Sequence, residues 1–198
     1  MEANVPVQDP FSLVIQQLRK INADLTSLIQ KYVQAQGFAN LDIPRESASM
    51  DVVNWTEMTA EQRLLANLTA FLELERRLER VIEEQKELLH PQEHILHGDL
   101  HNMLGQVAAL REQLEQIGEI FGLSRGNSSD TDGMEVVGGS VFDKKVRGYK
   151  VLKELSVWSI RSVRDILKIQ REREKYVRES MKEAETLMER VETHIGRE

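Results

Sequence analysis

The fold is decided first by a stretch near the N-terminus, residues 9–37, which reads DPFSLVIQQLRKINADLTSLIQKYVQAQG. Its apolar residues recur at steps of three and four, which places them along one face of an α-helix. Asp9 followed by Pro10 is the pattern of a helix N-cap with a first-turn proline, and Gly37 is the pattern of a helix end. We therefore predict a helix over about residues 10–36.

Three further stretches show the same helical period. Thr59 and Gln62 have the spacing of a capping box and predict a second helix over about 60–89. Pro91 predicts the start of a third helix over 91–121, and Ser140 precedes a fourth, over 141–169. The apolar residues expected to face inward from these three helices are Leu64, Leu65, Leu68, Phe71, Leu72, Leu78, Val81, Ile82, Leu100, Met103, Leu104, Val107, Leu114, Ile117, Phe121, Val141, Val146, Tyr149, Leu152, Leu155, Val163, Ile166 and Ile169. No segment alternates with period two over a useful length, so we predict an all-α protein.

The links between the helices predict the topology. The first helix is about 40 Å long at 1.5 Å per residue. The links over residues 37–58 and 123–139 can each span roughly 55 Å when extended, so either can run the length of a bundle. Two or three residues join the second and third helices, which must then be antiparallel neighbours. Long, short, long is the pattern of a long-chain four-helix bundle with up-up-down-down topology.

The helical pattern continues beyond the part that such a bundle can cover. In residues 170–198 a heptad seam is formed by Val177, Met181, Ala184, Met188, Val191 and Ile195. We expect residues 1–169 to form the four-helix domain and residues 170–198 to form an extended C-terminal helix. We further expect this extension to project from the bundle and to pair weakly with a second copy or with a receptor chain. The alternative is an amphipathic continuation of the fourth helix that folds onto the bundle or simply projects beyond it.

Composition limits the classes of function. Hydrophobic residues make up 40% and charged residues 30% of the 198, which is typical of one soluble domain. The net charge of −7 argues against nucleic-acid binding. No run approaches the roughly 20 apolar residues that span a bilayer, so we expect no membrane insertion. The absence of cysteine and of a basic, apolar N-terminal signal predicts a cytoplasmic protein.

A metal or catalytic centre is not indicated. His90, His94, His97 and His101 are spaced by four, three and four residues, and the last two have the spacing of helical zinc ligands. Pro91 interrupts this row, however, and no carboxylate stands at a clear third position, so a solvated helix start is favoured. We find no phosphate-binding loop and no nucleophile–base pair. We therefore expect no catalytic residue, no metal and no cofactor.

The strongest local signal lies at the start of the fourth helix, where residues 138–145 read GGSVFDKK and residues 148–162 read GYKVLKELSVWSIRS. Collinear matches precede it at residues 19–26, at Trp55, at residues 67–68 and at residues 106–109. Over roughly residues 12–169 this pattern resembles the ciliary neurotrophic factor family, among the interleukin-6-type long-chain helical cytokines. The resemblance implies a cytokine or neurotrophic growth factor that binds receptors, not an enzyme.

The resemblance also implies which residues meet which receptors. Phe142 and Lys145 match the family's FxxK motif, which engages the leukaemia inhibitory factor receptor. Arg19, Trp55 and Asp165 match the pattern for the ciliary neurotrophic factor receptor alpha chain. Read without the resemblance, Phe142 is more typical of a core residue that closes the bundle end, and Trp55 is as typical of loop packing.

A third contact, with the shared glycoprotein 130 signal transducer, would use the outward faces of the first and third helices. The candidates are Gln17, Asp24 and Gln113, chosen because they should face outward; each alone is typical of solvated helix surface. The chain departs from the family at Asn22, where a second basic residue is usual, and at Leu167, where an arginine is usual. The identity of the alpha receptor therefore stays open.

Together these features predict a cytokine that is released without a signal peptide, assembles cell-surface receptors and activates JAK-STAT signalling in support of neuronal survival and differentiation. The alternative is an intracellular helical scaffold that self-associates through the C-terminal heptads.

Overall fold

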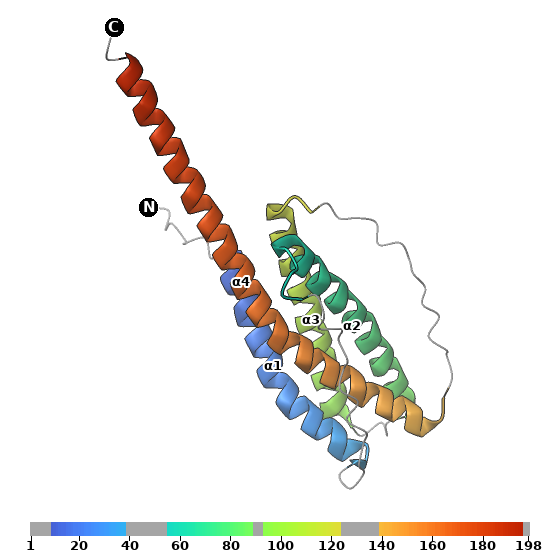
Figure 1. Ribbon diagram of the computed structural model, residues 1–198. Coiled ribbons are helices and arrows are strands. Elements are labelled where there is room, and N and C mark those ends of the chain that lie inside the picture. The colour runs from blue at the N-terminus through green and yellow to red at the C-terminus, as the bar shows by residue number, and fades with distance from the viewer. Residues whose placement is uncertain (1–8, 39–54, 89–92, 124–138, 196–198) are drawn as a thin grey trace, which may run out of the picture.

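The computed structural model describes residues 9–38, 55–88, 93–123 and 139–195 (Figure 1). Four helices occupy these ranges: α1, Pro10–Ala35; α2, Ala60–Leu88; α3, His94–Ile120; and α4, Val141–Ile195. The described ranges contain no strand, and the all-α prediction is confirmed. Within these ranges, no helix has the length and apolar character needed to cross a membrane.

Local chemistry sets the predicted helix ends. A carboxylate oxygen of Asp9 accepts a hydrogen bond from the backbone N–H of Ser12 at 3.1 Å, and Gly37 has a φ of +73°, which favours glycine. Thr59 and Gln62 exchange the two hydrogen bonds of a capping box. The predicted helix start at Pro91 lies outside the described residues.

Contacts between helix ends establish their directions. The Gln170 side chain donates to Asp9, and Tyr32 donates to the carbonyl of Lys145, so α4 runs antiparallel to α1. α1 and α2 each pack against both α3 and α4, and α1 and α2 lie diagonally opposite one another and run in the same direction (Figure 1). This is the predicted up-up-down-down bundle, and it is confirmed.

The core contains most of the residues that the helical period placed inward. Two expectations were wrong: the side chains of Leu65 and Val141 are exposed. Leu65 follows the buried Leu64, and one residue along a helix turns the side chain by about 100°, away from the core. Val141 is the first residue of α4, at the end of the bundle. The pattern also missed the buried residues Leu74, Leu96, Leu110 and Val151.

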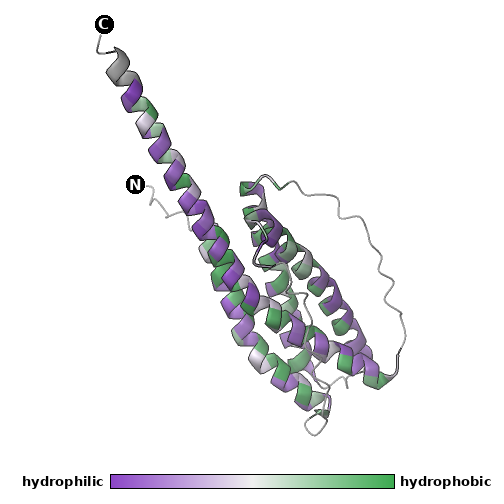
Figure 2. Cartoon of the chain, in the orientation of Figure 1, coloured by the Kyte–Doolittle hydropathy of each residue, from purple (hydrophilic) through white to green (hydrophobic). Residues whose placement is uncertain are grey.

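α4 is about twice as long as the helices that cover it. At 55 residues it extends for about 80 Å, whereas α1 has 26 residues. Burial along α4 ends at Ile169, and residues 171–190 are all exposed. The second half projects away from the other helices and is mainly hydrophilic (Figure 2). We call residues 171–195 the projecting segment.

Candidate functional site

The first candidate site lies at the N-terminal end of α4, where a capping box defines the helix start. The Ser140 hydroxyl accepts from the backbone N–H of Asp143 at 3.2 Å, and the Asp143 carboxylate accepts from the backbone N–H of Ser140 at 2.8 Å. Hydrogen bonds from Ser140 lower the pKa of Asp143. The cap sets the first turn, which carries Phe142 and leads to Lys145.

The Phe142 ring packs against one aromatic ring of the bundle and is otherwise exposed to solvent. Its side chain is 52% exposed, and its ring meets the ring of Phe38 edge to face, with centroids 6.1 Å apart. Phe38 is buried and also contacts Tyr149 edge to face, with centroids 6.5 Å apart. Phe142 is therefore neither a buried core residue nor a freely moving surface ring, because its inner edge is packed and its outer face is accessible.

Lys145, half-buried and three residues further on, shares a helical face with Phe142. Its backbone carbonyl accepts a hydrogen bond from the Tyr32 hydroxyl at 3.0 Å. That hydroxyl accepts from Gln85 at 2.9 Å, and Gln85 accepts from Gln36 at 2.7 Å. These buried polar contacts join the ends of α1 and α2 to the start of α4, and so hold Lys145 in place.

Tyr32 sits in close contact with α4. A Cβ atom added at Gly148 would lie 2.1 Å from the Tyr32 oxygen, so only glycine allows this approach. Burial, together with the nearby negative charge of Glu84, raises the pKa of Tyr32 above its usual range. The tyrosine therefore stays a neutral hydrogen-bond donor.

The second candidate site joins the segment before α2 to the later part of α4. Asp165 is only 4% exposed, and its carboxylate accepts hydrogen bonds from Trp55 Nε1 at 2.8 Å, Arg63 at 3.3 Å and Asn67 at 3.3 Å. Arg63 also donates to the Trp55 carbonyl. Asp165 is thus a buried anchor for the half-buried Trp55 and does not face solvent itself.

Above this anchor, aromatic rings and a cation form the surface. The Arg161 guanidinium lies 3.3 Å from the centroid of a Trp55 ring and 5.4 Å from one of Trp158. The Trp55 and Trp158 rings meet edge to face at 6.2 Å. The pKa of Arg161 is lowered, chiefly by burial. Among the residues described, Arg161 thus links the two indoles into one platform.

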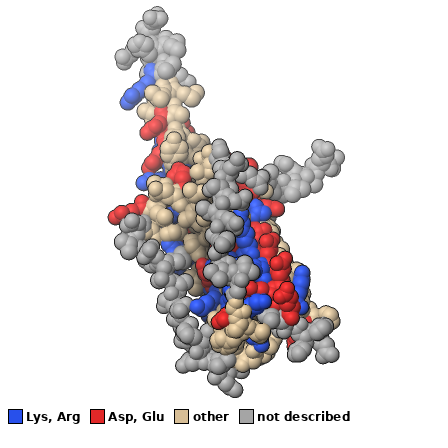
Figure 3. Space-filling model, turned by 90° about the vertical axis from the view of Figure 1, so that its right-hand side faces the viewer, with Lys and Arg blue, Asp and Glu red and all other residues tan. Residues whose placement is uncertain are grey.

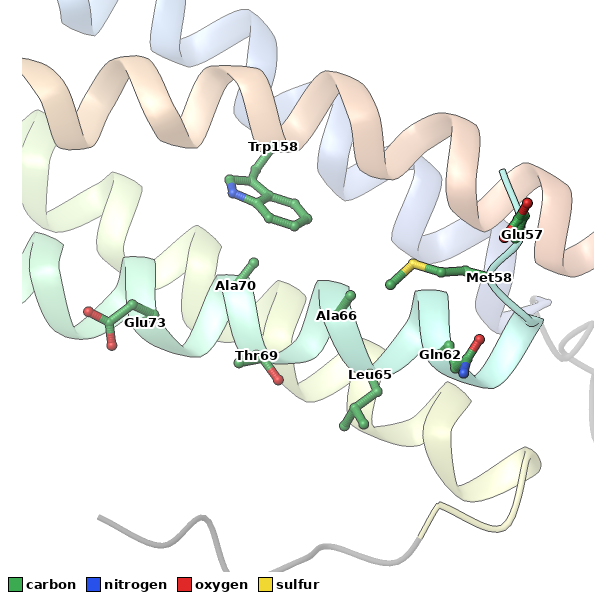
Figure 4. Close-up of a pocket in the computed structure, with 9 residues that line it drawn as sticks. All are labelled: Glu57, Met58, Gln62, Leu65, Ala66, Thr69, Ala70, Glu73 and Trp158. Atoms are coloured by element: carbon green, nitrogen blue, oxygen red, sulfur yellow. The ribbon is translucent and has the colours of Figure 1, made fainter. Parts of the chain in front are cut away.

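A groove opens beside Trp158. Its volume is about 920 Å³, and Trp158 projects from α4 toward Ala66 and Ala70 of α2, with Met58 at one end and Leu65 also lining it (Figure 4). The exposed Leu65, which was expected to face the core, gives this groove part of its apolar lining. Arg19 is exposed on α1.

The third set of candidates lies at the seam between α1 and α3. Gln17 donates to the carbonyl of Gln106 at 3.2 Å, and Asp24 accepts from the Gln106 side chain at 2.8 Å. Gln113 is half-buried, and within the described residues its buried Oε1 has no hydrogen-bond partner. All three were expected to face outward, but each is only partly exposed. Gln17 and Asp24 both contact Gln106, and Gln113 lies seven residues further along α3.

Sequence reasoning missed the residues that position these candidates. Phe38 and Tyr32 support the first site, and Arg161 links the rings of the second. Trp158, Arg161 and Asp165 are spaced by three and four residues and therefore share a face of α4. That spacing was the available signal for the second site. Nothing in the local sequence connects Phe38 to Phe142.

Charges of both signs are interspersed on the described surface of the bundle. On the side shown in Figure 3, Lys and Arg lie beside Asp and Glu. Several of these are cross-helix ion pairs, such as Arg77–Glu154 at 2.6 Å and Arg111–Glu75 at 2.6 Å. In the described part of the chain, no three His, Asp or Glu side chains are grouped to hold a metal ion. His90 of the predicted histidine row lies outside the described residues.

Known proteins are similar to this chain over most of its length. The profile of the ciliary neurotrophic factor family matches residues 3–184. The chain is 39% identical to ciliary neurotrophic factor of Sus scrofa over 153 residues, covering 75% of this chain and 76% of that protein. It is 38% identical to the Homo sapiens protein over 154 residues, with 75% and 76% covered. Cardiotrophin-2 of Mus musculus is 30% identical over 180 residues, with 81% of each chain covered.

The family profile covers all four helices of the bundle, including the bundle half of α4. The relatives are signalling factors and not enzymes, which supports a cytokine or neurotrophic factor with receptors as its partners. The chain belongs to the ciliary neurotrophic factor family.

Proposed function

We propose that this cytokine assembles a complex of the leukaemia inhibitory factor receptor, the glycoprotein 130 signal transducer and the ciliary neurotrophic factor receptor alpha chain. The complex activates JAK-STAT signalling and supports neuronal survival and differentiation. Release from the cytoplasm without a signal peptide is part of the same proposal. The family membership supports receptor binding in general; the residue geometry supports the division among receptors.

One observation carries the proposal: Phe142 presents an accessible ring that is already held in place. An aromatic anchor that is rigid before binding loses little conformational freedom on binding. Lys145 on the same face adds a flexible cation, and such pairs of aromatic and cationic side chains are typical of interface hot spots. We assign this pair to the leukaemia inhibitory factor receptor.

The test removes both side chains. Phe142→Ala with Lys145→Ala should raise the concentration for half-maximal STAT phosphorylation by about 30- to 700-fold, because truncating a central anchor costs about 2–4 kcal/mol of binding. The loss of the Phe38 contact should cost about 0.5–1.5 kcal/mol of folding stability. Binding to the isolated alpha chain should be unchanged.

The matched control is Lys175→Ala with Tyr176→Ala, which removes an exposed cation and an exposed aromatic ring from the projecting segment. This control should signal as the parent chain does. A double variant of Phe142 and Lys145 that folds and signals normally would refute the assignment. A collapse of its melting temperature would instead identify Phe142 as a residue that the bundle needs.

The alpha chain is assigned to the second site. Trp55 and the exposed Arg19 supply contacts, whereas the buried Asp165 acts through Trp55 by holding its indole. Trp55→Ala should weaken binding to the alpha chain, and Trp55→Phe, which keeps a ring but loses the bond to Asp165, should weaken it less. Equal binding by both variants and the parent chain in surface plasmon resonance would exclude this site.

The α1–α3 seam with Gln17, Asp24 and Gln113 is assigned to glycoprotein 130. These side chains are partly buried or hydrogen-bonded within the bundle. We therefore expect glycoprotein 130 to contact other surface atoms of α1 and α3 as well. The larger side chain in Gln113→Trp should block binding to glycoprotein 130 and leave binding to the alpha chain unchanged. Pull-down with each receptor ectodomain separately distinguishes the two.

A further inference from the structure

The projecting segment has apolar side chains that no other helix covers. Tyr176 is 72%, Met181 61% and Met188 66% exposed. Val177, Met181, Ala184 and Met188 are separated by four, three and four residues, so they form one seam along the helix. In heptad notation Val177 and Ala184 occupy d positions, and Met181 and Met188 occupy a positions. A helix with such a seam gains stability only when the seam is buried.

We propose that this seam pairs with the same seam of a second copy, as a short antiparallel coiled coil about a twofold axis. The axis lies between Met181 and Ala184. Met181 then packs against Ala184 of the second copy, and Val177 packs against Met188 of the second copy. Each long methionine meets a smaller side chain, which favours even packing along the seam.

The charges beside the seam select this direction. Arg171, Arg178, Glu185 and Glu192 follow one another at seven-residue intervals and occupy the e positions of the heptads. In an antiparallel pair e positions face e positions. The same axis brings Arg178 opposite Glu185 of the second copy, and the register places position 171 opposite position 192. The twofold axis repeats the pairing of Arg178 with Glu185, so two oppositely charged pairs flank the centre of the seam.

A parallel pair lacks this complementarity. In a parallel coiled coil, g positions face the e positions five residues later in the partner. Arg173 would then face Arg178 of the second copy, and the remaining positions would place Ser180 and Leu187 opposite glutamates. The parallel arrangement therefore contains a like-charge pair and no oppositely charged pair of this kind.

The length of the segment also fits. The proposed register places residue 195 opposite residue 170 of the second copy, which is where that copy's bundle begins. The paired stretch of 25 residues is about 38 Å long. One bundle lies at each end of it, so the two bundles do not clash. The seam contains methionine and alanine in place of leucine and isoleucine, so we expect weak and reversible pairing.

Sedimentation equilibrium of the full chain from about 10 μM to 1 mM tests the proposal. The apparent mass should rise with concentration above the 22.8 kDa of one chain toward that of two. Arg178→Glu alone and Glu185→Arg alone should each weaken association by about tenfold or more, since each replaces two attractions with two repulsions. The double exchange should restore association, and so should mixing the two single variants.

Two controls change charge equally without touching the flanks of the seam. Lys175→Glu and Glu179→Lys lie at b and f positions and should associate as the parent chain does. A parent chain that keeps the mass of one copy at 1 mM overturns the proposal. Single variants that associate normally, or a double exchange that fails to restore association, overturn the antiparallel register. Receptor activation is a separate readout, so failure here leaves the receptor proposal standing.

Discussion

The two halves of α4 belong to one helix yet meet different surroundings. From Val141 to Gln170 the helix buries an apolar stripe against α1 and α2 and forms ion pairs with α2, such as Arg77–Glu154. Beyond Arg173, whose guanidinium lies 5.8 Å from the centroid of the Phe11 ring, the same helical period continues with no helix beside it (Figure 1). An apolar stripe therefore shows that a helix has a face to bury. The lengths of the neighbouring helices decide whether it is buried.

The sources of stability differ accordingly. In the bundle half, burial of side chains such as Leu152 and Leu155 dominates. Among the described contacts, the projecting segment meets the bundle only near its start, where the Arg173 guanidinium lies 5.8 Å from the centroid of the Phe11 ring. Its other described contacts are exposed pairs within the helix, such as Lys175–Glu179 at 3.8 Å, each worth about 0.3–0.5 kcal/mol. Substitutions in the two halves should therefore differ in their effects on unfolding.

The largest effect is expected at the buried ion pair. Asp165→Ala should lower the free energy of unfolding by about 3–5 kcal/mol, because it leaves the charge of Arg63 buried without its partner. The matched control is Glu154→Ala, which breaks a partly exposed pair between the same two helices and should cost about 0.2–1 kcal/mol. Urea unfolding of both variants checks this, and equal losses would show that burial is not the deciding factor.

A smaller loss is expected where α4 approaches Tyr32. Gly148→Ala places a methyl group 2.1 Å from the Tyr32 oxygen and should cost about 1–3 kcal/mol, less any gain in helix propensity. Gly105→Ala in α3 is the control, because an added Cβ there meets no atom within 4 Å, and it should stabilise by up to about 1 kcal/mol. Opposite signs in thermal melts would confirm the close approach, and a stabilising Gly148→Ala would contradict it.

The same tyrosine should make the bundle sensitive to alkaline pH. The pKa of Tyr32 is higher in the folded chain than in the unfolded chain, so the folded state retains a proton that the unfolded state loses. This contribution is complete below pH about 10 and falls by about 1.4 kcal/mol per pH unit above it.

Unfolding by urea between pH 8 and pH 11.5 measures that slope. Tyr32→Phe should reduce the slope, although it also removes two hydrogen bonds at every pH. Tyr176→Phe, at an exposed tyrosine of the projecting segment, is the matched control. If both variants keep the parent slope, burial of Tyr32 does not govern the alkaline response.

The smallest effect is expected from removing the projecting segment. A chain ending at Gln170 loses no buried residue among those described, but it loses the contact of Arg173 with the Phe11 ring. Its free energy of unfolding at low concentration should therefore change by less than about 1 kcal/mol. Its far-ultraviolet circular dichroism should lose the signal of the missing helix. A fall of more than about 1 kcal/mol would show that the segment packs against the bundle in solution.

Much of the fold could be predicted because its signals are local. The cap at Asp9, the capping box at Thr59 and Gln62, and the spacing of apolar residues each depend on a few neighbouring residues. Loop lengths then favoured the up-up-down-down arrangement of the four helices. The motif at Phe142 and Lys145 pointed to the family without any knowledge of packing.

The sequence by itself thus determined the four helices, their order, the seam of the long C-terminal helix and the family. Only the tertiary structure decided how the candidate residues are presented: Phe142 open above a buried Phe38, and Asp165 buried beneath Trp55. Trp55 and Asp165 are 110 residues apart, and their hydrogen bond exists only because α2 and α4 pack together. Helical period specifies which face a side chain lies on, whereas its exposure depends on which distant residues the fold brings against that face.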